Sequence, residues 1–339
     1  MRVVIAGPGA LGTCYGVLLA RAGAEVCLLA RPERAPALRA GLRVSGLVDA
    51  VARPEIVTSG REAGHADYVF LTTKTLDTDA AIEALQGIDG QCFLSLQNGL
   101  AKDDALAAAF GADRVIGAAC AVGAHLVEPG HARLTLNVAT WIGELSGQTS
   151  ERVARLAAVL RAAGFPAWSV PNIRAVEWYK LCMLLPGALI TALSRRSYDE
   201  MALHPHLGPL WVQLLRETCA VARAHGMELV DPPGSPWRLG SWQAMPDEAV
   251  LAELRAIGER QRAAGEKTYP SMAQDVLAGR RTEAEDLAGD LVRRANAAGV
   301  PVPATETCYR LVRGLEDGFP AAGTPPGLHL PPAGTPGAA

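Results

Sequence analysis

The sequence predicts an α/β fold in which a parallel sheet covered by helices is followed by an all-helical C-terminal domain. Residues 1–170 alternate short β-branched runs with helical patterns, which is typical of strands connected by helices. From residue 150 onward, long segments with helical spacing of apolar residues dominate. The chain has 339 residues, more than one hydrophobic core usually organises, so two domains are expected.

Short apolar runs mark the strands of the first domain. They cover residues 2–6, 25–30, 42–47, 55–58, 67–72, 92–96, 114–118 and 133–141. Helical spacing predicts helices at residues 10–22, 78–85 and 103–110. Because strands and helices alternate, we expect one parallel sheet with helices on both faces.

Longer helical segments mark the rest of the chain. They cover residues 151–163, 173–193, 210–226, 247–263 and 283–298, with a short strand at 167–170. A stretch rich in Pro, Gly and Trp at 231–246 is predicted to be a loop or flap. The last 21 residues contain six prolines and four glycines, which is typical of a tail. The predicted units are residues 1–170, residues 171–318 and the tail 319–339.

The composition indicates a globular protein that binds small molecules. Its 32 Lys and Arg oppose 35 Asp and Glu without long blocks of one sign, so no nucleic-acid partner is expected. Seven widely spaced cysteines indicate buried thiols in a reducing compartment. The first residues show no basic-then-apolar leader, and the longest apolar run, residues 181–193, is shorter than the ~20 residues that a bilayer requires. We therefore expect a cytoplasmic protein with no membrane partner.

A glycine-rich loop, GPGALG at residues 7–12, lies between the first predicted strand and the first predicted helix. In this position glycines let the turn tighten and let the backbone approach a pyrophosphate, which the N–H groups of the helix start can bind. The pattern predicts a Rossmann dinucleotide-binding domain; a glycine turn without a ligand is the alternative. The expected cofactor contacts here are Gly7, Gly9, Ala10, Leu11 and Gly12.

A basic residue follows the second predicted strand, where NAD-specific enzymes usually carry an acid for the ribose hydroxyls. Arg31 stands here and can form two parallel hydrogen bonds to a 2′-phosphate, with Arg34 in support. Glu33 argues in the opposite direction, and a simple surface role for Arg31 is the alternative. The sequence therefore predicts NADP(H) as the cofactor.

Further motifs occur in a consistent order along the chain. They are Lys74, QNG at 97–99, EPG at 128–130, WIG at 141–143, WYKL at 178–181, SMAQD at 271–275 and TE at 282–283. Together with the glycine loop and Arg31 they resemble the ketopantoate reductase (2-dehydropantoate 2-reductase) family over residues 1 to about 317. The resemblance implies an NADPH-binding Rossmann domain and a helical domain that reduce a 2-keto acid in the cleft between them.

The resemblance implies Lys180 as the general acid and Glu283 as the second catalytic group. Reduction of a ketone leaves charge on oxygen, which an ammonium group can stabilise and protonate when burial lowers its pKa. Lys180 precedes the apolar run 181–185, which suits burial. A lysine extending from a helix end, and an acid in the first turn of a helix, are the alternatives.

The resemblance also implies ligand contacts outside the glycine loop. Ser271 and Asn98 would contact the substrate, with Asn98 between it and the nicotinamide, and Lys74 would contact the cofactor. A helix N-cap, a turn asparagine before glycine and a solvated loop lysine are the alternatives.

Two positions after Lys180 depart from the family pattern, which has asparagines that contact substrate four and eight residues beyond the lysine. Here those positions are Leu184 and Ala188, and Pro186 between them predicts a kink in the helix. Since a pocket that loses its polar groups loses discrimination steeply, an altered substrate is expected. The tryptophans of 231–246, Trp237 and Trp242, would offer aromatic surface to a larger or more apolar ligand.

The predicted function is NADPH-dependent reduction of a 2-keto acid or related carbonyl to the alcohol. Imine reduction, alcohol oxidation on the same scaffold and a non-catalytic NADPH sensor remain alternatives. The expected partner is a small-molecule carbonyl substrate, and a homodimer is left open. We expect no metal, because His204 and His206 have no Cys or carboxylate cluster at ligand spacing. His125 and His131 flank a predicted turn and are expected to be ordinary loop residues, with contact to the substrate as the alternative.

Overall fold

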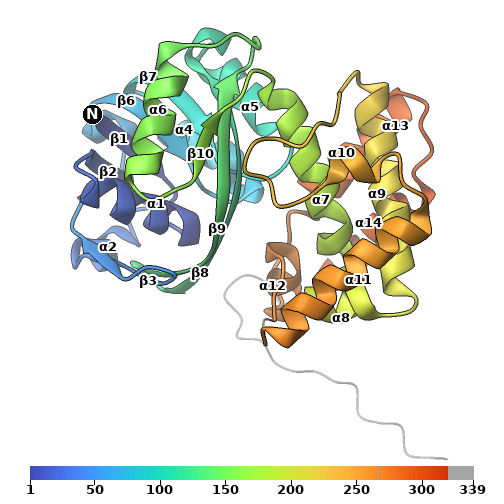
Figure 1. Ribbon diagram of the computed structural model, residues 1–339. Helices are drawn as coiled ribbons and strands as arrows, with labels where there is room; N and C mark the ends of the chain where they lie inside the picture. The colour runs from blue at the N-terminus through green and yellow to red at the C-terminus, as the bar shows by residue number, and fades with distance from the viewer. Residues whose placement is uncertain (266, 320–339) are drawn as a thin grey trace, which may run out of the picture.

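The computed structural model describes residues 1–265 and 267–319 and consists of an α/β part and a helical part (Figure 1). The predicted tail, apart from its first residue, lies outside the described residues. The fold class predicted from the sequence is confirmed. A long two-stranded ribbon and the helix α7 lie where the two parts meet.

The first sheet is wholly parallel and has the strand order β5-β2-β1-β6-β7. Its strands are β1 Arg2–Ala6, β2 Glu25–Leu29, β5 Glu55–Val57, β6 His65–Leu71 and β7 Asp89–Ser95. Alternate residues of β1 face opposite sides, so Val3 and Ile5 enter one core cluster while Val4 and Ala6 enter another. Both faces of the sheet are therefore buried, as expected for parallel strands.

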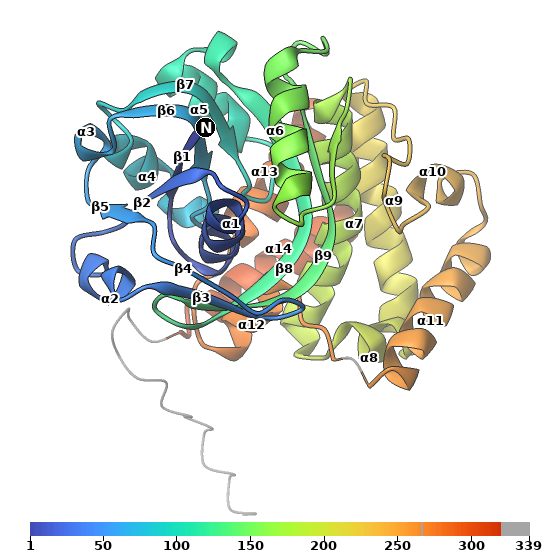
Figure 2. The same ribbon diagram turned by 60° about the vertical axis from the view of Figure 1, so that its left-hand side comes forward.

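Helices cover both faces of this sheet. In the first part of the chain they are α1 Ala10–Arg21, α2 Ala35–Arg39, α3 Gly60–Ala63, η1 Thr75–Asp77, α4 Thr78–Ala84, α5 Lys102–Phe110, η2 Ala112–Arg114 and α6 Glu151–Ala162. Helix α1 lies between the first sheet and a second one (Figure 2). Its Tyr15 stacks on Phe165 with ring centroids 4.1 Å apart and bonds the Thr140 hydroxyl at 2.8 Å.

A second sheet corrects the prediction of one parallel sheet. It contains β3 Leu42–Gly46, β4 Ala50–Ala52, β8 Ile116–Glu128, β9 His131–Glu144 and β10 Ala167–Ser169, in the order β10-β9-β3-β4 with β8 also paired to β9. β8 and β9 pair antiparallel through a tight turn at Pro129 and Gly130, with register shifts along the ribbon. The predicted strand 114–118 is thus the start of a much longer strand. Pairing with β9 extends it through Gly123 and Ala124, which have low intrinsic strand propensity.

The helical part surrounds a single large core cluster. Its elements are α7 Ile173–Ser194, α8 Tyr198–Leu203, α9 Leu207–Ala224, α10 Leu239–Trp242, α11 Asp247–Ala263, α12 Ser271–Leu277, the π-helix η3 Glu285–Gly289, α13 Asp290–Ala297 and α14 Pro303–Glu316. The predicted helix 283–298 is therefore a π-helical turn followed by α13. Trp242 is buried edge-on against Trp211 with its Nε1 bonded to Glu253, so it does not offer aromatic surface to a ligand.

Helix α7 is the longest apolar helix and remains continuous through Pro186. Among the described residues it is the one helix with the length and composition to cross a membrane, and 83% of its apolar window is buried inside the protein. Its first turn packs closely on the ribbon, because a Cβ on Gly117 or Gly143 would lie 2.7 or 3.0 Å from Ile173. The glycines of β8 and β9 thus let the helical part approach the second sheet.

Candidate active site

The glycine loop connects β1 to α1 in a close turn. Gly7 has φ +90°, and a Cβ there would lie 2.8 Å from the backbone N of Thr73. Only glycine fits this position without strain. A Cβ on Gly9, by contrast, would meet nothing closer than 4.0 Å, and no side chain caps the start of α1. The open backbone and the uncapped helix start fit a pyrophosphate.

Three other predicted residues follow strands of the parallel sheet that lie on either side of β1. Arg31 follows β2, Lys74 follows β6 and Asn98 follows β7, so all three lie at the same carboxyl edge as the glycine loop. The backbone N–H of Gly7 donates to Leu29 at 3.2 Å, which ties the loop to the end of β2. This edge is where ligands bind in open α/β sheets.

The predicted 2′-phosphate residue already has an acidic partner. Arg31 donates to Asp77 Oδ1 at 2.6 Å, and the two side chains are 57% and 46% exposed. An exposed ion pair is weak, so the guanidinium remains available to an anion of higher charge. Asp77 lies in η1, just after Lys74, and was missed by the sequence analysis.

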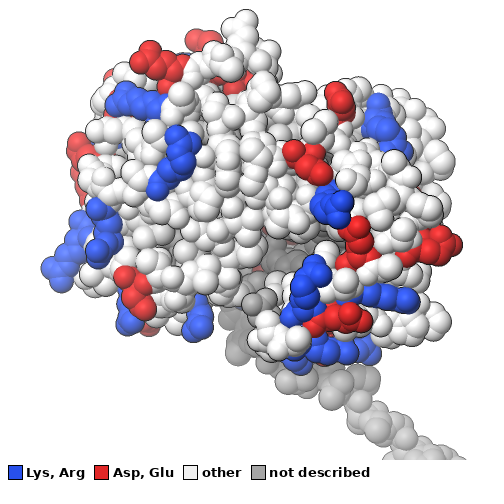
Figure 3. All heavy atoms as spheres, in the orientation of Figure 1, with Lys and Arg blue, Asp and Glu red and all other residues white. Residues whose placement is uncertain are grey.

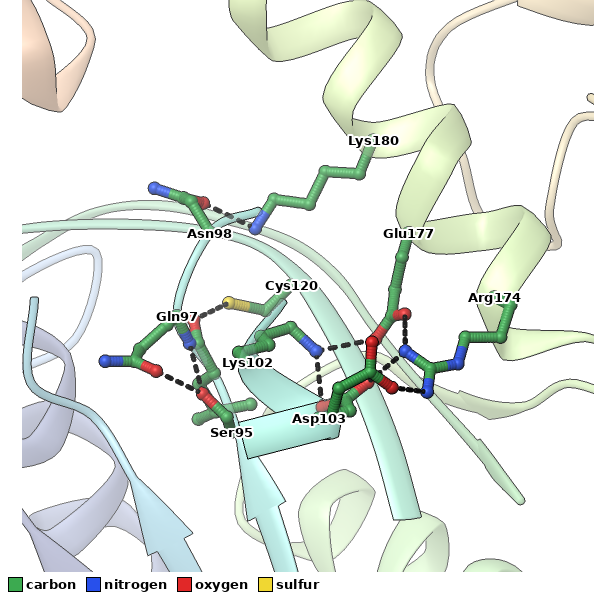
Figure 4. A network of polar contacts seen from close by, with 11 residues as sticks. Ser95, Gln97, Asn98, Lys102, Asp103, Cys120, Arg174, Glu177 and Lys180 are labelled. Carbon is green, nitrogen blue, oxygen red and sulfur yellow. Dashed lines mark hydrogen bonds and ion pairs between the residues drawn. The ribbon is translucent and has the colours of Figure 1, made fainter. Parts of the chain in front are cut away.

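Lys180 reaches across from α7 to the parallel sheet. Its Nζ donates to Asn98 Oδ1 at 2.8 Å (Figure 4). Burial lowers the pKa of Lys180 below its ordinary value, and the positive charge of Lys102 adds to this, while Glu283 and Glu177 act in the opposite direction. A lysine with a lowered pKa releases its proton more readily to a developing alkoxide.

Glu283 and helix α12 of the helical part contact the segment that follows β6 at the carboxyl edge of the first sheet. Glu283 is 5% exposed and its Oε1 accepts from the backbone N–H of Thr75 at 3.0 Å. Lys74 forms an ion pair with the buried Asp275 of α12. His125, predicted to be an ordinary loop residue, lies instead in β8 of the second sheet, and its Nδ1 bonds Gln274 Oε1 of the same helix at 2.9 Å. The contacts at Thr75 and Lys74 bring the helical part onto the edge of the first sheet, and the contact at His125 brings it onto the second sheet.

The remaining residues predicted to contact substrate lie in three different environments. Leu184 lies one turn beyond Lys180 and lines the same small pocket with Gln97 and Gly99. Ala188 is 2% exposed and belongs to the core of the helical part. Ser271 is exposed at the beginning of α12. Leu184 is therefore the departure from the family pattern that changes the surface of the pocket next to Lys180.

Sequence reasoning missed a buried ionic cluster beside this pocket. Lys102 contacts Asp103 at 2.8 Å and Glu177 at 2.5 Å, and Arg174 lies on the other side of the two carboxylates (Figure 4). Burial and the neighbouring Asp103 raise the pKa of Glu177 well above its ordinary value, against the influence of Lys102. The only sequence signal was Glu177 three residues before Lys180, on the same helix face.

Metal and disulfide chemistry have no visible site in the described part of the chain. Residues 1–265 and 267–319 contain no group of three His, Cys, Asp or Glu placed to hold a metal ion. All seven cysteines are buried and free.

On the face drawn in Figure 3, basic and acidic side chains are interspersed.

A parallel sheet with an open glycine loop, joined to a helical domain that brings a lysine to its carboxyl edge, defines a dinucleotide-dependent oxidoreductase. Two family models match the chain: Ketopantoate reductase PanE/ApbA over residues 3–147 and Ketopantoate reductase PanE/ApbA C terminal over residues 172–316. The chain belongs to the ketopantoate reductase family and is a nicotinamide-dependent oxidoreductase.

Several relatives resemble the chain over nearly its whole length. The 2-dehydropantoate 2-reductase of Archaeoglobus fulgidus is 31% identical over 318 residues, which cover 94% of this chain and 99% of the relative. That of Halobacterium salinarum is also 31% identical, over 92% of this chain and 98% of the relative. The PanE/ApbA family ketopantoate reductase of Ralstonia eutropha has a TM-score of 0.78 and 32% identity, covering 94% of this chain and 99% of that structure. A D-mandelate dehydrogenase bound to NADH and anilino(oxo)acetate shares the fold at a TM-score of 0.78 and 22% identity, covering 94% and 99% of the two chains.

Proposed function

We propose that the protein reduces a 2-keto acid or related carbonyl to the alcohol with NADPH, with Lys180 as the general acid. The observation that carries this proposal is the hydrogen bond from Lys180 Nζ to Asn98 at the carboxyl edge of the parallel sheet. It brings Lys180, whose pKa is lowered by burial, to the edge where a dinucleotide would lie. The domain boundary near residue 170 is part of the proposal, supported by the end of β10 at Ser169 and the start of α7 at Ile173.

The glycine loop and three basic or amide side chains would hold the cofactor. Gly7, Gly9, Ala10, Leu11 and Gly12 would contact the pyrophosphate through the backbone. Arg31 would exchange Asp77 for the 2′-phosphate, and Lys74 and Asn98 would lie along the rest of the dinucleotide. When bound, NADPH supplies the hydride.

The protein's own groups would then manage the proton and the substrate. Lys180 holds a proton on Nζ, and Asn98 Oδ1 fixes the direction of the ammonium group by accepting one of its hydrogens. The charged Nζ stabilises negative charge on the substrate oxygen before it donates the proton. Glu283, anchored on the Thr75 N–H, would offset the positive charge of Lys180 and orient its ammonium group toward the substrate oxygen. Ser271 and Leu184 would contact the remainder of the substrate.

Turnover of NADPH with a panel of 2-keto acids, other ketones and imines tests this function. We expect oxidation of NADPH with at least one 2-keto acid and formation of the corresponding 2-hydroxy acid. Turnover of imines alone would replace the proposal with imine reduction. Tight NADPH binding without turnover of any member of the panel would leave a non-catalytic NADPH sensor as the function.

A further inference from the structure

The ionic cluster beside the pocket has no part in the mechanism above. Lys102 is 3% exposed, Glu177 2% and Asp103 0%. Lys102 and Asp103 begin α5 in the α/β part, whereas Glu177 lies on α7 in the helical part. The cluster therefore joins the two parts through charges removed from water, which is a costly way to connect domains.

Two of its carboxylate oxygens are unsatisfied. Asp103 Oδ2 and Glu177 Oε2 have no hydrogen-bond partner among the described residues. Arg174 lies 3.8 Å from each of them, and its hydrogen bond goes to Asp104 at 2.5 Å instead. A connection selected for stability alone would be expected to satisfy buried polar atoms. The arrangement instead holds an ammonium group in place and leaves one oxygen of each carboxyl group without a hydrogen bond.

The cluster and Lys180 share one pocket. Lys102, Glu177 and Lys180 all line it, together with Leu184. Figure 4 shows the Lys102 ammonium group on the side of the cluster that faces Lys180 and Asn98. A second positive charge in a poorly solvated pocket disfavours the charged form of a neighbouring lysine.

Titratable groups from three elements and one connecting segment influence the pKa of Lys180. They are Lys102 of α5, Cys120 of β8, Glu177 of α7 itself and Glu283, which precedes η3. Lys102 is the one cation among them. Its positive charge favours release of the Lys180 proton.

We propose that Lys102 is a positioning residue for the reaction: Asp103 and Glu177 hold its ammonium group at the wall of the Lys180 pocket, where it promotes proton donation by Lys180. The inference rests on the proposed function for the role of Lys180 as general acid. The rival interpretation is that the cluster only holds the two parts of the protein together.

Four variants separate these interpretations. Lys102→Met removes the charge and keeps the length of the side chain. Lys102→Gln also removes the charge but keeps a hydrogen-bond donor for the two carboxylates, and it replaces the Met variant if that variant does not fold. Lys102→Arg retains the charge. Arg174→Gln is the matched control, because it disturbs the same cluster from the side away from the pocket.

The pKa of Lys180 is read in two ways in the full-length protein. One is the basic limb of the pH profile of kcat, and the other is the pH dependence of acetylation of Lys180 by acetic anhydride, quantified by peptide mass spectrometry. The second reading needs no activity, so it tests the placement of Lys102 even if no carbonyl substrate is turned over. Thermal unfolding of each variant measures the structural contribution separately.

We expect Lys102→Met or Lys102→Gln to raise the pKa of Lys180 by about one unit in both readings, from the interaction of two charges at an effective dielectric constant of about 20. Lys102→Arg, which retains the charge, should leave the pKa of Lys180 close to its wild-type value. Arg174→Gln should lower the unfolding temperature without changing the pKa of Lys180. An unchanged titration in both neutral variants, or an equal shift in Arg174→Gln, would overturn the proposal and assign the cluster a purely structural role.

Discussion

Lys180 and Asn98 lie 82 positions apart in the sequence, yet Lys180 Nζ donates to Asn98 Oδ1 at 2.8 Å across the junction of the two domains. Each residue comes from a different domain, so neither half of the chain forms the pair alone. The bond fixes the end of a flexible side chain beside the expected position of the nicotinamide. Its formation depends on α7 packing closely on the glycines of β8 and β9.

Lys180→Ala should lower kcat by roughly 100-fold or more while NADPH affinity stays nearly constant, because general acid catalysis is lost and the glycine loop is untouched. Stopped-flow turnover and fluorescence titration of NADPH measure the two quantities. Since burial lowers the pKa of Lys180, the lysine should lose its proton at a lower pH than an ordinary lysine, whose pKa is about 10.4. Wild-type activity should therefore begin to decline with rising pH before that value is reached.

Lys267→Ala is the control for this variant, because Lys267 is 65% exposed and pairs with Glu200. It should leave kcat, the pH profile and NADPH affinity at wild-type values. Near-normal turnover in Lys180→Ala would make Lys180 a structural residue, and a large loss of NADPH affinity would assign it to cofactor binding.

Periodic patterns were sufficient for elements whose own residues strongly favour one conformation. The predicted helix 247–263 coincides with α11, and β1 has the predicted limits 2–6. The second half of β8 was missed because its strand conformation depends on pairing with β9 rather than on its own residues. Helix α14 was also missed, although Pro303 in its first turn was a usable start signal.

The candidate site likewise contains residues that a local motif identifies and residues that only the fold brings together. Motifs located the glycine loop, Asn98 and Lys180 as separate features, because each has a recognisable local sequence. The Lys102–Glu177 pair could not be predicted, since it forms only when α5 and α7 meet across 75 positions. The burial of Ala188 depended in the same way on the packing of α7 in the helical core.

Arg31→Ala should lower NADPH affinity tenfold or more with little effect on NADH, because charge-assisted bonds to a 2′-phosphate contribute about 1.5–3 kcal/mol. Asp77→Asn should act in the opposite direction, since it removes the carboxylate that now occupies Arg31. Fluorescence titration with both cofactors gives the ratios. Equal affinities of the wild type for NADPH and NADH would refute the assignment of Arg31.

Glu316 anchors the segment that carries Glu283. Its Oε1 accepts from the Thr282 N–H at 2.7 Å, and both side chains are buried at the end of α14. Glu316→Ala leaves the Thr282 donors without this acceptor, so we expect a loss of about 1–3 kcal/mol in the free energy of unfolding and a lower kcat. Glu316→Gln retains an acceptor and should recover much of both, as measured by chemical denaturation and steady-state kinetics. A wild-type kcat in Glu316→Ala would contradict a positioning role for Glu316.

Leu184 should decide how well the protein accepts ketopantoate. It presents an apolar surface in the Lys180 pocket where the family pattern has an amide, so a polar substrate group would be desolvated there without a partner, at about 1–3 kcal/mol. We expect the wild type to prefer 2-keto acids with apolar side chains, and Leu184→Asn to raise kcat/KM for ketopantoate relative to those acids. Ala188→Asn is the contrasting variant: its amide would enter the helical core, so it should lower the unfolding temperature without improving the ratio. Efficient ketopantoate reduction by the wild type would show that other groups, such as Ser271 or His125, bind the polar end of the substrate instead.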